Sequence, residues 1–289
     1  MEHVTTASRE ITAPIRPLPS GFSDVPYIGL ELGIPGKNLL LLLDTGTSVT
    51  LLRESLRTDV DLRKVTEGQI EPGDGDSGKQ TIYFTSSMDL DGFQLRNEPI
   101  TFFSDERFEY LAQGSGTRID GILGCSVLKR GEIEIDGPQK LLTIRPFEEG
   151  RITSLPSRVP LIFIPDSNSY AVPLESDSEN QGRFLLDSGT NAALILARDS
   201  RLGKEARKTP PLSSTECRTW HGTYSVEVHS LPTALALGKY LFKSESRVFV
   251  EERSDSRLKG SIGVPIFWNC SRVVLNHEEQ LAAFEVAEQ

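Results

Sequence analysis

Residues 27–47 read YIGLELGIPGKNLLLLLDTGT, and residues 170–190 read YAVPLESDSENQGRFLLDSGT. The two segments align without a gap, and each ends in an apolar run, an aspartate, a small hydroxyl residue, a glycine and a threonine. Further along, residues 119–144 (IDGILGCSVLKRGEIEIDGPQKLLTI) are echoed by residues 258–284 (LKGSIGVPIFWNCSRVVLNHEEQLAAF). A repeat this long indicates duplication of a whole lobe rather than a solenoid of short units.

The duplication predicts two similar halves in one chain. A chain of 289 residues is long enough for each half to bury a core of its own. We expect an N-terminal extension over residues 1–22, a first lobe over 23–151, a linker over 152–160 and a second lobe over 161–289. The linker falls in a Pro- and Ser-containing stretch between the repeats.

Short apolar or β-branched runs, separated by Gly, Pro, Asp or Asn, predict strands in both halves. No long window keeps a helical period of 3.6 residues, although one short helix per half is expected after Gly124 and Gly263, the first ending at Gly131. The predicted fold is therefore all-β, with two β-barrel-like lobes related by pseudo-twofold symmetry and few short helices. The predicted strands include residues 39–43, 82–84, 100–103, 133–135, 141–144, 184–186, 225–228, 247–250 and 272–275.

Each half places an aspartate, Asp44 or Asp187, directly after an apolar strand. A carboxylate there is costly unless it is hydrogen-bonded, and a turn through Gly46 or Gly189 lets backbone N–H groups point at it. If the pseudo-twofold axis brings the two loops together, the carboxyl groups can share a proton and hold a water between them. One then acts as base and the other as acid, which suits amide hydrolysis without a covalent intermediate.

Thr47 and Thr190 follow the two Asp-Thr/Ser-Gly triplets and add a hydroxyl to each loop. A hydrogen bond to the charged form of a carboxyl group lowers its pKa, so these donors predict an acidic pH optimum. The alternative is that each triplet is only a turn, since one such triplet arises by chance in about one chain in eight of this length. Two triplets at the same place in a duplicated unit favour a catalytic pair.

The sequence resembles the pepsin- and retropepsin-like aspartic peptidases, in the style of compact bacterial single-chain members, over most of residues 25–284. The family signature is a D-[TS]-G loop followed, later in the same lobe, by two apolar residues and a glycine. Residues 122–124 (ILG) match this element, and residues 261–263 (SIG) match it with Ser261 as a departure. The resemblance implies the acid-protease fold.

The resemblance also implies roles for residues of the two loops. Asp44 and Asp187 would be the catalytic dyad, and Thr45 and Ser188 would hydrogen-bond across the axis and brace the loops. A flap is implied as well, a β-hairpin that closes over the substrate and often carries a tyrosine. Tyr83, after the Gly-rich acidic stretch 67–79, is the flap candidate, and an ordinary strand aromatic is the equal alternative. Trp220 and Tyr224 allow a second flap in the second lobe.

These features favour an aspartic endopeptidase that binds an extended peptide by strand addition between the lobes. The alternative is a catalytically silent peptide-binding or inhibitory protein with the same fold, and retention of both aspartates favours the enzyme. A cation site fits poorly, because Ca²⁺ takes six to eight oxygens and no Asp-rich loop accompanies either triplet. Since both halves of the site lie in one chain, we expect an active monomer.

The composition of the chain argues against several classes of binding partner and cofactor. The net charge of -10, with scattered basic residues, argues against nucleic acid and anionic membranes. Cys125, Cys217 and Cys270 show no CxxC spacing and the four histidines are dispersed, so we expect free thiols, no metal and no cofactor. No apolar run approaches the ~20 residues of a membrane-spanning helix, and no signal peptide is evident. The compartment stays open between cytoplasm and export, although free thiols suit the cytoplasm.

Overall fold

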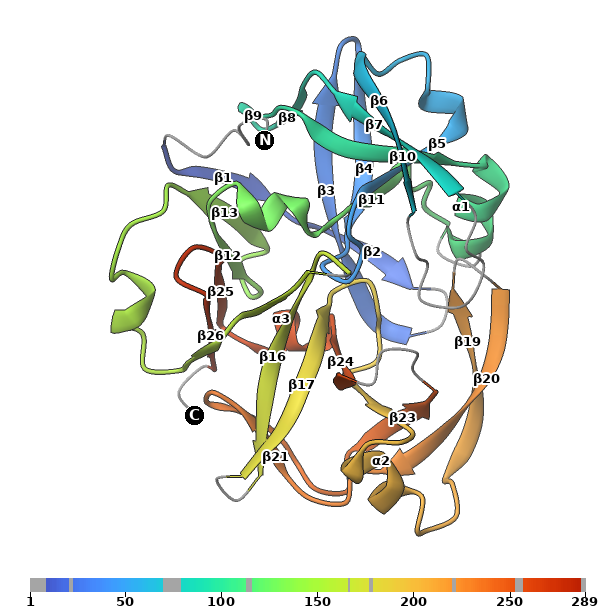
Figure 1. Ribbon diagram of the computed structural model, residues 1–289, viewed down its shortest axis with the longest axis vertical. Coiled ribbons are helices and arrows are strands. Elements are labelled where there is room, and N and C mark those ends of the chain that lie inside the picture. Colours follow the sequence, from blue (N-terminus) through green and yellow to red (C-terminus); the bar gives the residue numbers. More distant parts are fainter. Residues whose placement is uncertain are drawn as a thin grey trace.

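The computed structural model describes residues 9–20, 23–69, 79–112, 116–165, 167–176, 179–219, 222–252 and 257–286. Strands dominate the described residues, and the helices are few and short, which confirms the predicted fold class. Two curled sheets form the upper and lower parts of the molecule in Figure 1, and a third sheet joins them. All nine predicted strand segments lie within strands of the structure.

The first half folds into a ten-stranded sheet. Its strands are β2 (Arg16–Ser20), β3 (Ser23–Ile34), β4 (Lys37–Leu43), β5 (Thr50–Arg53), β6 (Leu62–Gln69), β7 (Lys79–Thr85), β8 (Met88–Leu90), β9 (Phe93–Leu95), β10 (Glu98–Phe103) and β11 (Gly121–Leu123). They are ordered β6-β7-β10-β5-β11-β4-β3-β8-β9, with β2 paired to β3. Helix α1 (Asp105–Ala112) follows β10.

The second half repeats this sheet strand for strand. Its strands are β15 (Ile162–Ile164), β16 (Ser169–Ser176), β17 (Glu179–Asp187), β18 (Leu194–Ala197), β19 (Ser213–Thr219), β20 (Gly222–Ser230), β21 (Leu235–Leu237), β22 (Tyr240–Phe242), β23 (Arg247–Glu251) and β24 (Leu258–Gly263). Their order is β19-β20-β23-β18-β24-β17-β16-β21-β22, with β15 paired to β16. Helices α2 (Arg201–Ala206) and α3 (Pro265–Asn269) belong to this half.

A six-stranded sheet, at the left of Figure 1, takes three strands from each half. Its order is β1 (Ile11–Pro14), β13 (Leu141–Arg145), β12 (Glu132–Asp136), β25 (Arg272–Asn276), β26 (Leu281–Glu285) and β14 (Arg158–Pro160). At its centre β12 and β25 pair antiparallel, with Glu134 opposite Val274. Because β12 and β25 are equivalent strands of the repeat, the pseudo-twofold axis passes through this pair.

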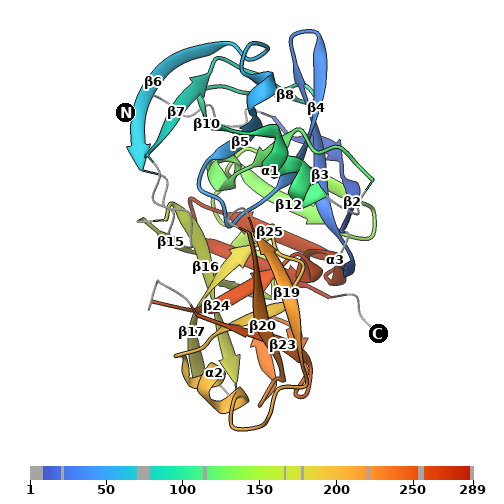
Figure 2. The same ribbon diagram turned by 90° about the vertical axis from the view of Figure 1, so that its right-hand side faces the viewer.

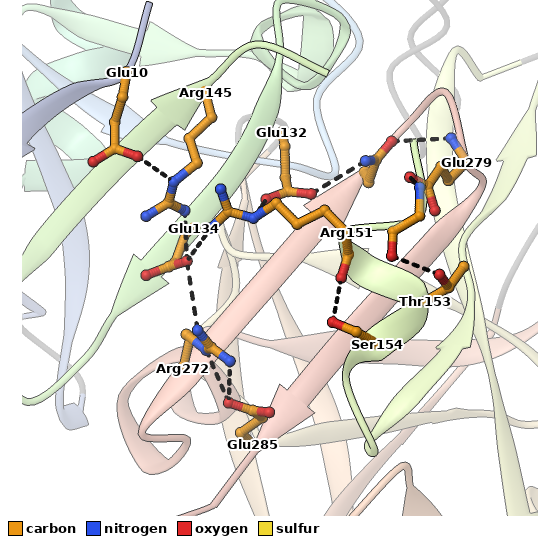
Figure 3. A network of polar contacts seen from close by, with 12 residues as sticks. Glu10, Glu132, Glu134, Arg145, Arg151, Thr153, Ser154, Arg272, Glu279 and Glu285 are labelled. Carbon is orange, nitrogen blue, oxygen red and sulfur yellow. Dashed lines mark hydrogen bonds and ion pairs between the residues drawn. The ribbon is translucent and has the colours of Figure 1, made fainter. Parts of the chain in front are cut away.

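The two faces of the joining sheet differ in chemistry because side chains alternate along each strand. Ile133 and Ile135 are buried in the core, whereas Glu132 and Glu134 point to the other face, where arginines surround them (Figure 3). This ion-pair network crosses from one half of the chain to the other. It joins Arg145 to Glu10 and Glu134, Arg151 to Glu132 and Glu134, and Arg272 to Glu134 and Glu285.

The lobe boundaries stay a prediction, but the segment expected as an N-terminal extension contains two strands. Strands β1 and β2 fall within residues 1–22, assigned to an N-terminal extension, yet they are the counterparts of β14 and β15 in the second half. Ile11, Ala13 and Ile15 bury their side chains in the core. These strands were not predicted because they contain prolines, which usually indicate a loop. Strand β1 tolerates Pro14 because it lies at the edge of a sheet.

The segment 152–160, predicted as the linker, contains a 3₁₀ helix (Ile152–Ser154) and β14. It therefore contributes a strand to the joining sheet, while the division into two lobes around it stays a prediction.

The short helices follow the glycines as expected. A 3₁₀ helix (Cys125–Lys129) comes after Gly124, and α3 comes after Gly263. Glycine is required at position 131 by packing rather than by the end of a helix, because a Cβ there would collide with the main-chain oxygen of Arg145 on β13. A further 3₁₀ helix spans Glu54–Leu56. Among the described residues, no helix has both the length and the apolar character needed to cross a membrane.

Candidate active site

The two aspartates lie at the carboxyl ends of equivalent central strands. Strand β11 runs parallel to β4 and places Leu123 beside Leu43, and the Asp44 N–H donates to the Leu123 oxygen at 2.9 Å. In the second half, β24 runs parallel to β17 and places Gly263 beside Asp187. Both aspartates therefore leave a buried sheet at the same relative position.

The two loops interlock through the residues that follow the aspartates. The Thr45 hydroxyl donates to the Leu186 oxygen at 2.7 Å, and the Ser188 hydroxyl donates to the Leu43 oxygen at 2.8 Å. Each hydroxyl also accepts from the backbone N–H of the opposite residue, at 3.0 Å in both directions. Both residues are fully buried, so these four bonds fix one loop against the other without competition from water.

The glycines bring the two carboxyl groups to the same place. A Cβ built on Gly46 would lie 2.8 Å from Cγ of Asp187, and one built on Gly189 would lie 2.6 Å from Oδ1 of Asp44. Each carboxyl group thus packs directly on the glycine of the opposite loop, which only a residue without a side chain allows. The structure brings together Asp44 and Asp187, as the duplication predicts.

Asp44 is the more buried of the two aspartates, at 7% exposure. Burial raises its pKa, and this effect outweighs the hydrogen bonds from Thr47, Gly46 and Asp187, which lower it. The Gly46 N–H donates to Oδ1 at 2.8 Å and the Thr47 hydroxyl to Oδ2 at 2.7 Å. The predicted donor is therefore present in this loop, but burial opposes the acidic pKa that was expected from it.

The Asp187 loop repeats part of this pattern. The Gly189 N–H donates to Oδ1 of Asp187 at 3.0 Å, and the Thr190 N–H donates to the main-chain oxygen of Asp187 at 3.2 Å. Asp187 is half-buried. A hydrogen bond from the Thr190 hydroxyl to the Asp187 carboxylate stays a prediction.

The two apolar-Gly elements lie directly behind the loops. The Cys125 N–H donates to the Thr47 oxygen at 2.8 Å, and the Val264 N–H donates to the Thr190 oxygen at 2.7 Å. A Cβ on Gly124 would lie 2.6 Å from the carbonyl of Val49, so this position requires a glycine. The residue that follows each predicted packing element is thus hydrogen-bonded to the threonine after the loop glycine, Thr47 in the first half and Thr190 in the second.

A buried ion pair behind the first loop was not predicted from the sequence. Glu98 and Arg130 are at most 1% exposed, and Nη2 of Arg130 lies 2.7 Å from Oε2 of Glu98. Thr50 links this pair to the loop support, because its hydroxyl donates to Glu98 at 2.7 Å and accepts from the Gly124 N–H at 3.2 Å. The Ser126 hydroxyl also donates to Glu98. Nothing in the local pattern distinguishes these charges from surface residues.

Tyr83 lies on β7, in the hairpin that β6 and β7 form. Its hydroxyl accepts from Arg57, and its ring packs edge-on against Phe102 at 5.5 Å between centroids. Both contacts belong to the first half, so a flap role for Tyr83 stays a prediction. The tip of this hairpin, residues 70–78, lies outside the described residues, as does Trp220.

The β19–β20 hairpin is the second-half counterpart, and Tyr224 on it donates to Glu251 at 2.9 Å. Figure 1 shows β6 descending and β19 rising toward the middle of the molecule, and Figure 2 shows the two hairpins from the side. Across the described parts of the chain, no group of three or more His, Cys, Asp or Glu side chains could hold a metal ion. The three cysteines, all described, are free thiols.

Comparison with known proteins agrees with this architecture. No protein-family model and no curated protein matches the sequence. Among solved structures, the chain is similar to the aspartic proteinase from the fungus Irpex lacteus, with a TM-score of 0.55 and 13% sequence identity over 96% of this chain and 98% of that one. At this identity the likeness shows the fold alone, which is that of a two-lobed, pepsin-like aspartic proteinase.

Proposed function

We propose that this protein is an aspartic endopeptidase whose catalytic dyad is Asp44 and Asp187. The observation that carries the proposal is the interlocked pair of loops, in which each carboxyl group packs on the glycine of the opposite loop. A turn motif without a function has no need to bring two carboxyl groups together at a partly buried position, because a desolvated carboxylate costs free energy.

The reaction follows from the singly protonated state of the dyad, in which one aspartate is ionised and the other is protonated. The two carboxyl groups titrate as one pair, in which burial raises the pKa of Asp44 and a hydrogen bond from Asp187 lowers it. The ionised aspartate takes a proton from the bound water as the water oxygen bonds to the peptide carbonyl carbon, while the protonated aspartate donates its proton to the carbonyl oxygen. A proton then passes to the peptide nitrogen, and the C–N bond breaks to leave an acid and an amine.

The substrate of such a site is an extended peptide or a protein segment, bound between the halves by strand addition. Because one chain supplies both aspartates, a monomer is sufficient for activity. Sedimentation or small-angle scattering of the active protein checks this, and activity confined to a dimer contradicts it.

The test is incubation with a mixed peptide library at several pH values, with and without a statine-type inhibitor. We expect inhibitor-sensitive cleavage that is lost in Asp44→Asn and in Asp187→Asn while both variants stay folded by circular dichroism. Ser200→Ala, which removes the N-terminal cap of α2, serves as a control at a distance from the dyad. Cleavage that persists in either asparagine variant refutes the dyad assignment. Peptide binding without cleavage in the parent selects the silent, peptide-binding alternative.

A further inference from the structure

Asn168 reaches from the second half of the chain to the loop that carries Asp44. Its side-chain Nδ2 donates to the main-chain oxygen of Ser48 at 3.2 Å, and its Oδ1 accepts from Lys129 at 2.6 Å. Its main-chain oxygen accepts from the thiol of Cys125 at 2.6 Å. One residue thus contacts the catalytic loop and the 3₁₀ helix behind it.

These contacts enclose Thr47 from two sides. Ser48 is its neighbour in the chain, and the Cys125 N–H donates to the Thr47 oxygen at 2.8 Å. Thr47 in turn donates its hydroxyl to Oδ2 of Asp44. A displacement of Ser48 or Cys125 is therefore passed to the Asp44 carboxyl group through a single intervening residue.

The backbone at Asn168 is built for this contact. Its φ of 46° lies in the left-handed region, which asparagine adopts more readily than most residues. The turn is closed by a hydrogen bond from the Asn168 N–H to the Pro165 oxygen at 3.2 Å. This conformation directs both the amide and the main-chain oxygen at the first half.

The residue equivalent to Asn168 in the first half of the chain is not an asparagine. By the alignment of Tyr27 with Tyr170, the counterpart of Asn168 is Val25, and a valine side chain carries no hydrogen-bond donor. The counterpart of Lys129 is Trp268, which does reach the first half, donating to the Pro26 oxygen at 2.6 Å. Contact between the halves is thus duplicated, but the position equivalent to Asn168 carries no side-chain amide.

We propose that Asn168 is a positioning residue for peptide hydrolysis, whose amide holds the Ser48 carbonyl and thereby fixes the hydrogen-bond donors around Asp44. This role rests on the proposed function, since it assigns Asn168 to the same dyad. It makes the geometry of one aspartate depend on a turn of the opposite lobe.

Three variants separate the contacts. Asn168→Asp keeps the acceptor for Lys129 and tolerates the left-handed backbone but loses the donor to Ser48. Asn168→Gly keeps the backbone and adds no charge. The matched control is Asn97→Asp, which makes the same substitution at another left-handed asparagine (φ 53°) in the turn before β10.

We expect kcat to fall about tenfold in both Asn168 variants with KM nearly unchanged, because sub-ångström misplacement of a reacting group is costly. The acidic limb of the pH profile should move to higher pH, since weaker donors to the carboxylate raise the pKa of the pair. The Asn97 control should match the parent. Thermal midpoints are measured alongside, because a purely structural role lowers stability without moving the pH profile.

Titration of the aspartate ¹³Cγ signals gives a readout that does not need turnover. If both Asn168 variants keep the parental kcat, pH profile and carboxyl titration, or if the control changes equally, the positioning role is refuted. If the parent cleaves no peptide, the proposed function fails, and the titration alone decides. A shift of the Asp44 and Asp187 titration in both Asn168 variants but not in the control then supports positioning, and an unchanged titration overturns it.

Discussion

Gly189→Ala should disable the site by displacing the Asp44 carboxyl group. The new Cβ would lie 2.6 Å from Oδ1 of Asp44 and closer still to Cγ and Oδ2, whereas ordinary contact begins at 3.4 Å. The carboxyl group or the loop must therefore move by about 1 Å, and misplacement on this scale costs roughly a hundredfold in rate. Gly46→Ala, with its Cβ 2.8 Å from Cγ of Asp187, should lose less activity.

The assay is kcat/KM on a peptide that the parent cleaves, with Gly33→Ala as the control. Gly33 lies in β3, where the nearest atom to a new Cβ is 3.5 Å away, so this variant should cleave like the parent. We expect activity in the order Gly33→Ala, Gly46→Ala, Gly189→Ala. Near-parental activity in Gly189→Ala, in a folded protein, would show that the packing of the loops does not set the position of the reacting carboxyl group.

Three further predictions concern pH and stability. Thr47→Ala removes a hydrogen bond to the charged form of Asp44, so the acidic limb of the pH–activity profile should move to higher pH. Thr47→Ser keeps the hydroxyl and should keep the parental profile. An unmoved profile in the alanine variant contradicts the role of this hydroxyl. Burial raises the pKa of Asp44 above its unfolded value, so the stability from this carboxyl is fully present below the unfolded pKa and is lost as pH rises through the folded pKa. Asp44→Asn should therefore raise the thermal midpoint at neutral pH, by about 2 °C or more, and the gain should disappear on acidification; a gain that is the same at every pH speaks against ionisation as its cause. Arg130→Met leaves the buried carboxylate of Glu98 without its partner and should cost about 3–5 kcal/mol in the free energy of unfolding, measured with denaturant. Arg16→Met at the exposed Arg16–Glu31 pair should cost at most about 1 kcal/mol, and equal losses for the two would mean that the buried pair contributes no more than a surface one.

The fold and the candidate dyad could be predicted because the same short motif occurs at the same position in both halves of a duplicated sequence. A single Asp-Thr-Gly is a common turn, but Asp44 and Asp187 occupy the same place in two aligned units. Strands such as β4 and β25 could be predicted from their own composition, because β4 contains a run of five leucines and β25 contains two β-branched valines.

Features that depend on contacts between distant segments could not be predicted. Strands β1 and β2 carry prolines, which read as loop until the sheet edges they occupy are known. Glu98 and Arg130 read as surface charges, because their pairing depends on a contact across 32 residues of chain. The raised pKa of Asp44 has the same origin, since the local donors were visible in the sequence but the burial that outweighs them comes from both halves.

The ion-pair network on the joining sheet has a consequence for how the two halves recognise each other (Figure 3). At the axis Glu134 faces Val274, its own equivalent in the second half, and Arg272 of that half lies 4.0 Å from Glu134. If two copies of the first half associated instead, Glu134 would face Glu134, and Glu132 and Asp136 would lie close by. Two partners from the second half would then be missing, namely Arg272 beside Glu134 and Asn276, whose amide donates to Glu132 at 3.2 Å. Like charges directly opposite one another destabilise a sheet. The two halves therefore differ in charge at this sheet, which favours pairing of the two halves within one chain over pairing of two identical first halves.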